Sequence, residues 1–344
     1  MFLLNRVPHA LLVATLLLAA CGSDGGSNAS TINTSPPEPL ELQATSAPFE
    51  LGSLAAEYYE AIEYGPYEEN LFDIYLPESD QPTPLLIYIH GGGFTGGSRD
   101  TSGSEERVLS YLAEGVAYAS IDYRLLKSPD PDGVIKPLQD STRCLQFIRY
   151  HAQQLNINRA NIILMGGSAG AGTALWIGFN DEMADPSNED PVLRQTTRVK
   201  ALIAIATQAT YDIGKWTTVV FEEYRLNLLE LADALGLAQA LLDFYGITDV
   251  DDFESPEILE YRARVDMLDL MDAEDPPFYV DNFLEPAAPP LTPDLAFHHA
   301  NHALVLSDRA DELGIENVAY MKALGIEDPS GEDSLDFALR HFGL

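Results

Sequence analysis

Short apolar runs alternate with amphipathic segments along most of the chain, and this alternation constrains the fold more than any other feature. Short apolar runs are typical of buried strands, and apolar residues recurring every three or four positions predict helices. The predicted strands cover 71–76, 85–89, 116–121, 161–165, 199–206, 278–283 and 317–321, and the predicted helices 105–114, 138–155, 169–179, 296–313 and 334–341. Strands joined through helices lie parallel in one sheet. The sequence therefore predicts an α/β fold with a doubly wound, mostly parallel sheet.

The alternation is interrupted between residues 207 and 275, where the pattern is helical. Segment 226–245 is apolar along one stripe, and 256–271 favours further helices. Twelve acidic residues but only two basic ones lie between positions 243 and 275. A charge run of this kind is most often a solvated face. We therefore expect 207–275 to be a helical cap insertion over a site.

The N-terminus has the pattern of an export signal. Arg6 precedes an apolar run over residues 10–20, which is too short to span a bilayer. The run ends in Leu-Ala-Ala-Cys, with the cysteine at position 21, and this resembles a bacterial lipobox. The resemblance implies cleavage before Cys21 and acylation of its thiol.

The sequence predicts that the chain divides into three segments. Residues 1–20 are predicted to be a lipoprotein signal peptide, residues 21–48 a flexible tether rich in Gly, Ser and Pro, and residues 49–344 one folded domain. The lipid would be the only attachment to a membrane. The expected location is the bacterial cell envelope, at the outer membrane and facing the periplasm or the surface.

The charge and cysteine content exclude several classes of protein. With 54 acidic and 19 basic residues the net charge is −35, which argues against a nucleic-acid partner because phosphate binding needs clustered Lys and Arg. The acidic surface is also expected to disfavour anionic substrates. The only cysteines are Cys21 and Cys144, too few for a disulfide framework or a Cys-rich zinc site. Cys144, among apolar residues of a predicted helix, is expected to be a small core residue.

The segment Gly166–Gly170 fits the pattern Gly-x-Ser-x-Gly, and it lies where a predicted buried strand meets a predicted helix. A serine on such a strand-to-helix turn is held with its hydroxyl exposed. Upstream, His90 to Phe94 reads His-Gly-Gly-Gly-Phe and also directly follows a strand. Glycines there let backbone N–H groups approach a ligand oxygen. A Walker phosphate loop is excluded because its Gly-Lys-Ser/Thr pattern is missing.

These motifs resemble those of the α/β-hydrolases, and specifically the carboxylesterase and hormone-sensitive-lipase-like esterase group. His90–Phe94, Asp122–Leu125 and Gly166–Gly170 occur in that group's order. The specific match covers roughly residues 71–206, and the remainder agrees only in its strand and helix plan.

The resemblance implies hydrolysis of small-molecule carboxylic esters through an acyl-enzyme, without a cofactor. It makes Ser168 the nucleophile and the backbone N–H groups of Gly92, Gly93 and Ala169 the oxyanion hole. It also implies two residues that support the site without taking part in the chemistry. His90 would brace the glycine loop, and Asp122 would support the site from below.

A serine nucleophile needs a general base, normally a histidine oriented by a carboxylate. In the esterase group this histidine follows the last strand, but Ile326 stands there and no histidine occurs between residues 303 and 340. His341 lies in the predicted C-terminal helix, where a role on the surface of an amphipathic helix is favoured over catalysis.

The remaining candidates are His298, His299 and His302, near the carboxyl edge of the predicted sheet. His299 is slightly preferred to His298 as the base. The competing interpretation is a cluster that only packs and caps, because Thr292-Pro293-Asp294 is typical of a helix N-terminus. A metal site on His298 and His302 is disfavoured, because His299 stands where a zinc protease would need its glutamate.

The acid that would orient the histidine also has alternatives. Counting from the start of the penultimate strand reaches Glu285, and counting back from the following helix reaches Asp294, which we rank equally. Asp281 is a third choice, although it falls within the strand.

The missing histidine leaves two functional hypotheses. The first is a serine hydrolase of carboxylic esters, and the second is a catalytically inactive relative with a binding or envelope role. The distance from Ser168 to the nearest imidazole nitrogen separates them. A value of about 3 Å favours the enzyme, and no imidazole within about 6 Å favours the binding protein.

Overall fold

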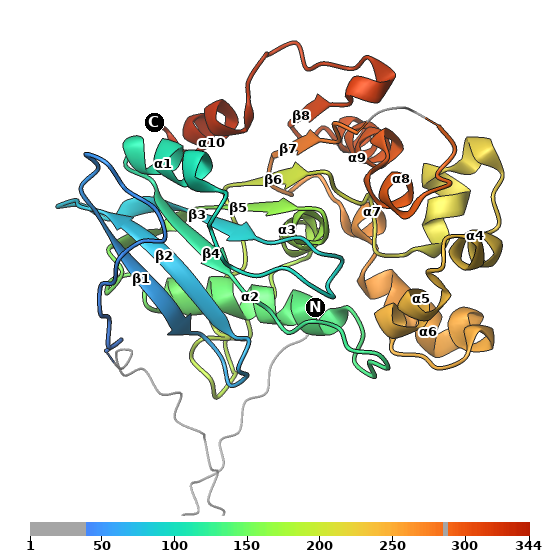
Figure 1. The fold of residues 1–344 in the computed structure, drawn as a ribbon, viewed down its shortest axis with the longest axis horizontal. Helices are drawn as coiled ribbons and strands as arrows, with labels where there is room; N and C mark the ends of the chain where they lie inside the picture. The colour runs from blue at the N-terminus through green and yellow to red at the C-terminus, as the bar shows by residue number, and fades with distance from the viewer. Residues whose placement is uncertain (1–38, 285–287) are drawn as a thin grey trace, which may run out of the picture. The chain divides into compact units, whose positions relative to one another are not determined.

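The computed structural model describes residues 39–284 and 288–344 of the chain. Eight strands form one sheet in the order β1-β2-β4-β3-β5-β6-β7-β8 (Figure 1). From β4 across to β8 the neighbouring strands are parallel, and the two pairs that β2 makes, with β1 and with β4, are antiparallel. The strands are β1 (Ala56–Glu63), β2 (Leu71–Pro77), β3 (Thr83–Ile89), β4 (Ala117–Ile121), β5 (Ile157–Gly167), β6 (Ala201–Ile205), β7 (Phe278–Asp281) and β8 (Asn317–Tyr320). The predicted mostly parallel α/β fold is confirmed.

Helices cover both faces of the sheet. On one face α1 (Glu105–Ala113) and α10 (Ser334–Phe342) bury their apolar stripes against strand residues such as Tyr118 and Ile163. On the other face lie α2 (Ile135–Tyr150), α3 (Ala169–Phe179) and α9 (Ala300–Leu313). Cys144 is fully buried in this second layer, as expected for a core residue. Within the described ranges, no helix is both long enough and apolar enough to cross a membrane.

The edge of the sheet differs from the sequence prediction. β1 was not predicted, because Ala56–Glu63 contains three glutamates and its buried and exposed positions do not alternate cleanly.

The predicted tether, residues 21–48, overlaps the folded domain at its C-terminal end. Its last residues lie on the domain, where the Leu40 N–H donates to Gln154 Oε1 at 2.7 Å and Thr45 pairs with Tyr58. Leu40 and Leu42 are apolar enough to pack on the core, which is why the chain is already ordered here.

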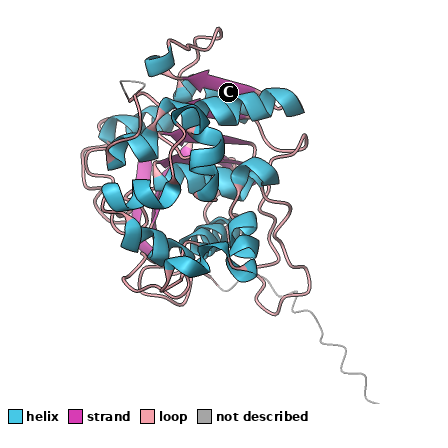
Figure 2. Cartoon of the chain, turned by 90° about the vertical axis from the view of Figure 1, so that its right-hand side faces the viewer, coloured by secondary structure: helices cyan, strands magenta, loops and turns pink. Residues whose placement is uncertain are grey.

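The segment between β6 and β7 is helical and lies at one side of the sheet (Figure 1). Figure 2 faces this side, where helices dominate the view. The segment contains α4 (Leu228–Ala234), α5 (Ala238–Tyr245), α6 (Pro256–Arg264) and α7 (Met267–Leu270), with short helical turns at 216–220, 222–224 and 250–254. A further turn, at 322–324, follows β8. We call residues 207–275 the cap.

The predicted helix over 296–313 is two helices in the structure. α8 (Pro293–His298) begins at the Thr292 N-cap, whose hydroxyl accepts the Leu295 N–H at 3.3 Å. His299 then takes an extended conformation (φ −59°, ψ 144°) and is itself the N-cap of α9. The break turns α8 away from the line of α9, and α8 carries two of the candidate site residues.

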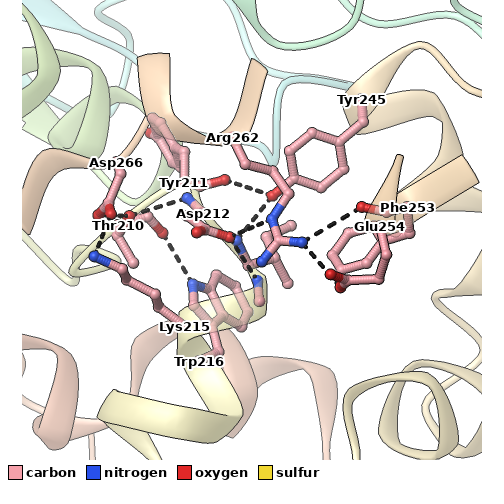
Figure 3. Close-up of polar contacts among 12 residues, drawn as sticks. Thr210, Tyr211, Asp212, Lys215, Trp216, Tyr245, Phe253, Glu254, Arg262 and Asp266 are labelled. Carbon is pink, nitrogen blue, oxygen red and sulfur yellow. Dashed lines mark hydrogen bonds and ion pairs between the residues drawn. The ribbon is translucent and has the colours of Figure 1, made fainter. Parts of the chain in front are cut away.

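A buried polar network within the cap joins its later helices to its first residues, which leave β6 (Figure 3). Arg262 of α6 donates to Asp212 at 2.7 Å and to Glu254 at 3.0 Å. Lys215 forms ion pairs with Asp266 and Asp269. Because these charges are mostly buried and paired, removing one partner leaves an uncompensated charge in the interior.

Two tyrosines, whose contact with each other is drawn in Figure 3, continue this attachment to α3. The Tyr245 hydroxyl of α5 donates to the Tyr211 carbonyl at 2.6 Å. The Tyr211 hydroxyl donates in turn to the Ala169 carbonyl at 2.6 Å. The cap is thus tied to the first residue of α3.

We expect Arg262→Met to lower the free energy of unfolding by about 3–5 kcal/mol, because Asp212 would stay buried without its ion pair. That loss corresponds to a fall in Tm of about 10 °C, measurable by calorimetry. Arg340→Met is the matched control, since Arg340 pairs with Glu316 and Glu332 with 42% of its side chain exposed. Exposed pairs contribute about 0–1 kcal/mol. Equal Tm changes in the two variants would contradict an anchoring role for Arg262.

Candidate active site

Ser168 lies on the turn between β5 and α3, with φ 51° and ψ −119°. A non-glycine residue with positive φ is strained, and this strain is a known feature of nucleophile turns. The turn is held in place because the Ser168 N–H donates to the Ile205 carbonyl at 2.8 Å. Gly170 is required by packing, since a Cβ there would lie 2.0 Å from the Ile89 carbonyl oxygen.

His298 is the histidine that meets Ser168. Its Nε2 lies 2.8 Å from Ser168 Oγ, and its Nδ1 lies 2.9 Å from Asp294 Oδ1. A carboxylate only accepts hydrogen bonds, so Nδ1 carries the proton and Nε2 is free to accept from the serine hydroxyl. Asp294 and His298 are four residues apart on α8, and therefore share one face of that helix. Asp294 is largely exposed, at 68% of its side chain, whereas His298 is at 19%.

The C-terminal end of α8 is held by side chains from other segments. A helix of six residues leaves most of its carbonyls without an intrahelical partner. Gln208 Nε2 donates to the Phe297 carbonyl at 2.8 Å, and Asn282 Nδ2 donates to the His299 carbonyl at 3.0 Å. His302 Nε2 lies 2.9 Å from the Ala296 carbonyl.

The hydrogen-bond partners of His302 determine which of its ring nitrogens carries the proton. The Ala209 N–H donates to His302 Nδ1 at 3.1 Å, so Nε2 carries the proton that goes to Ala296. The ring packs edge-on against Trp216 and Phe221, with centroids 5.0 and 5.3 Å away. Burial lowers the pKa of His302 to about 3, so the side chain is neutral. Its role in this arrangement is to position α8.

The structure does not bring His299 to Ser168, which reverses the order in which we ranked the two neighbouring histidines. His299 is buried, its Nδ1 accepts the Asn301 N–H at 3.0 Å, and its Nε2 lies 3.0 Å from the Ala288 carbonyl. The physical reason is the helix break, which gives His299 the N-cap position of α9. His298 and His302 lie on different helices for the same reason. In the described part of the chain, no three His, Cys, Asp or Glu side chains are gathered to hold a metal ion.

The alternative acids take no part in this arrangement. Glu285 lies outside the described residues. Asp281 is within β7, paired with Tyr320 of β8 and Ile205 of β6, and burial raises the pKa of its carboxyl. Of the carboxylates considered from sequence, Asp294 is the one with a hydrogen bond to the histidine at Ser168.

The glycine loop after β3 faces the same serine. Gly92, Gly93 and Ala169 line one cavity together with Ser168. His90 stacks on Tyr123 with ring centroids 4.3 Å apart, and its Nδ1 lies 2.7 Å from the Gly91 carbonyl.

Asp122 lies behind this loop. It accepts from the Arg99 N–H at 2.5 Å and lies 3.7 Å from His90 Nε2. Both His90 and Asp122 therefore support the loop without contacting Ser168.

The cavity beside Ser168 has a volume of about 640 Å³. Its walls come from the glycine loop, from α8 and from the cap, and they are mostly aliphatic and aromatic. Such a cavity, mostly apolar with a few convergent polar groups, is typical of a small-molecule site.

Sequence reasoning missed the side chains that hold α8, namely Gln208 and Asn282, and it missed Tyr211. Gln208 and Asn282 follow β6 and β7 at the carboxyl edge of the sheet, which is the one signal that could have suggested them. Their partners include the backbone carbonyls of Phe297 in α8 and of His299 just after it, and no sequence pattern identifies such partners.

His302→Gln is expected to change how stability depends on pH. Burial holds the folded pKa of His302 near 3, below its ordinary value of 6.5, so the unfolded chain binds a proton first as the pH falls. The wild type therefore loses stability on acidification from pH 6.5 towards 3, and this contribution is absent in the variant. Tm values between pH 7.5 and 4 measure the difference. Parallel curves for the two proteins would show that His302 is not buried in its neutral form.

Comparison with known proteins places this site in a family. Over 120 residues the chain is 32% identical to an acetyl esterase of Salmonella schwarzengrund (strain CVM19633), and the matched segment spans 33% of this chain and 34% of that enzyme. A truncated carbohydrate esterase from gut microbiota has a TM-score of 0.56 at 14% identity, with 89% of this chain and 99% of that chain covered.

An acetyl ester-xyloside bifunctional hydrolase from Caldicellulosiruptor lactoaceticus has a TM-score of 0.51 at 19% identity, with 80% and 83% covered. At these identities the solved structures establish the fold, and the predicted α/β-hydrolase fold is confirmed. The BD-FAE family model matches residues 72–282, which is more than half of the chain. The chain therefore belongs to the BD-FAE family.

Proposed function

We propose that this protein is a serine hydrolase of carboxylic esters, with Ser168 as nucleophile, His298 as general base and Asp294 as the acid that orients the base. The observation that carries the proposal is the 2.8 Å separation between Ser168 Oγ and His298 Nε2, on the strained turn after β5. The acetyl esterase and carbohydrate esterase named above support the same reaction class. The catalytically inactive alternative is not favoured, because it was motivated by the lack of a histidine and an imidazole does reach the serine.

The reaction starts with attack of Ser168 Oγ on the ester carbonyl while His298 Nε2 takes the hydroxyl proton. The charge that develops on the carbonyl oxygen is stabilised by the N–H groups of Gly92, Gly93 and Ala169. His298 then gives its proton to the leaving alcohol, and an acyl-enzyme remains. Water, activated by the same imidazole, attacks the acyl group and restores the serine.

Asp294 keeps His298 in the required tautomer by accepting the Nδ1 proton. In this chain the base and its acid lie on one short helix after β7, and the strand that usually precedes the histidine, β8, contributes neither. Because Asp294 is exposed to water, its charge is screened, and it stabilises the imidazolium less than a buried carboxylate does.

Ser168→Ala and His298→Ala are each expected to lower kcat for p-nitrophenyl esters by about 10,000-fold or more, because each removes a member of the catalytic unit. Asp294→Asn is expected to cost less, about 10- to 100-fold, since the aspartate is exposed and screened. Steady-state kinetics on the purified protein measure all three.

His341→Asn is the matched histidine control, because His341 lies in α10 against Phe337. Glu285→Gln is the matched acid control. Both controls are expected to keep kcat within about threefold of the wild type. A larger loss for Glu285→Gln than for Asp294→Asn would assign the acid to Glu285, and full activity of His298→Ala would end the proposed mechanism.

We also propose that the protein is a lipoprotein of a bacterial cell envelope, anchored through acylated Cys21 and otherwise not inserted in the membrane. The supporting feature is the sequence of an apolar run ending in Leu-Ala-Ala-Cys, which lies outside the described residues. We place the catalytic domain at the outer membrane, facing the periplasm or the surface.

Cys21→Ala is the test of the anchor. In a bacterial host grown with radiolabelled palmitate, the wild type is expected to be labelled and to sediment with membranes. Globomycin, which inhibits the lipoprotein signal peptidase, is expected to leave a precursor of higher mass. The Cys21→Ala protein is expected to lose the label, and an unlabelled, freely soluble wild type would contradict the anchor.

A further inference from the structure

The cap presents an aliphatic wall to the nucleophile. Two of its helices, α4 and α5, and the turn between them line the cavity next to Ser168. The leucines on this wall are Leu228, Leu231, Leu235, Leu237 and Leu241. Each of these apolar side chains that faces water in the cavity contributes favourable binding free energy when an apolar ligand covers it.

The cavity offers few free polar groups besides the catalytic ones. Apart from the catalytic residues and the aromatic side chains, the polar side chains that line it are those of Thr95, Gln208 and Asp243. The Gln208 amide already donates to the Phe297 carbonyl at 2.8 Å, and Asp243 accepts from Gln239 at 3.0 Å. A sugar bound against this wall would bury several hydroxyls without partners, which costs free energy for each of them.

The α5 part of the wall is also anchored to the rest of the cap. Tyr245 at the end of α5 donates to the Tyr211 carbonyl, and the Arg262 and Lys215 ion pairs hold the rest of the cap (Figure 3). Tyr211 and Trp216 of this attachment line the cavity themselves. A preformed apolar cavity binds a chain without a cost for ordering the protein.

Resting on the proposed function, we infer that the substrate is a neutral ester with an extended aliphatic chain, and that this chain lies against the five leucines of the cap. The inference differs from what the names of the relatives suggest, which is acetyl groups and carbohydrates. Asp243 in the wall and the net charge of −35 disfavour chains that end in a carboxylate.

The chain could belong to either half of the ester, and two substrate series distinguish the halves. p-Nitrophenyl esters from acetate to octanoate extend the acyl group, and acetates from ethyl to octyl extend the alcohol. We expect kcat/KM to rise by about fourfold per methylene in one series, and by on the order of 100-fold over the first four methylenes. The series that rises identifies which half binds the wall.

Ala240 gives a variant that tests the wall directly. It lies on α5, lines the cavity and is solvent-exposed at the rim, so a larger side chain there need not disturb the core. Ala240→Trp is expected to lower the octanoate-to-acetate ratio of kcat/KM by about tenfold or more (or the octyl-to-ethyl ratio, if the alcohol series rises). Ala238→Trp is the matched control, because Ala238 is exposed on the same helix and does not line the cavity. Its ratio is expected to stay within about twofold of the wild type.

The outcomes separate this inference from the proposed function. Hydrolysis of acetates with flat profiles in both series, or better hydrolysis of an acetylated xyloside than of any aliphatic ester, would overturn the aliphatic substrate and leave the esterase intact. An unchanged ratio in Ala240→Trp would overturn the place of the chain on the cap. No hydrolysis of any ester, together with no labelling of Ser168 by a fluorophosphonate, would remove the proposed function and this inference with it.

Discussion

The hydrogen bond between Ser168 and His298 depends on a six-residue helix that could not hold its position alone. α8 is too short to satisfy its own carbonyls, and Gln208, Asn282 and His302 satisfy three carbonyls at its C-terminal end and just beyond it. Two of these side chains follow β6 and β7, and the third lies in the first turn of α9, so the carboxyl edge of the sheet and α9 together set the position of the base. The parallel sheet thus positions the residue that takes the proton through two of these side chains, and α9 does so through the third.

The cap depends on the same edge. Its ion pairs and tyrosines join its helices to its first residues, which leave β6, and Tyr211 links those first residues to Ala169 beside the nucleophile. The cavity is therefore bounded by α8 and by the cap, and both are attached to segments that leave the carboxyl edge of the sheet. This arrangement explains how a largely aliphatic wall is held facing a catalytic serine, and why we expect loss of Arg262 to affect more than one contact.

Sequence reasoning identified the parts whose signal is local. Apolar runs predicted seven of the strands, and Gly-x-Ser-x-Gly located Ser168, because a strained turn between strand and helix needs small residues at fixed positions. It ranked His299 slightly ahead of the neighbouring His298, and the structure reverses that order. The choice follows from a helix break at His299, whose carbonyl accepts a hydrogen bond from Asn282 of the segment after β7, and no local sequence pattern reveals that contact. β1 was missed because its glutamates mask the alternation of an edge strand.

The structure of a phosphonate adduct tests the central claim most directly. A short-chain alkyl phosphonate is predicted to form one covalent bond, between phosphorus and Ser168 Oγ. One phosphonate oxygen is expected within hydrogen-bonding distance of the Gly92, Gly93 and Ala169 N–H groups, with His298 Nε2 facing the leaving-group side and Nδ1 on Asp294. An adduct at another residue, or one in which a different histidine faces the phosphorus, would contradict the account.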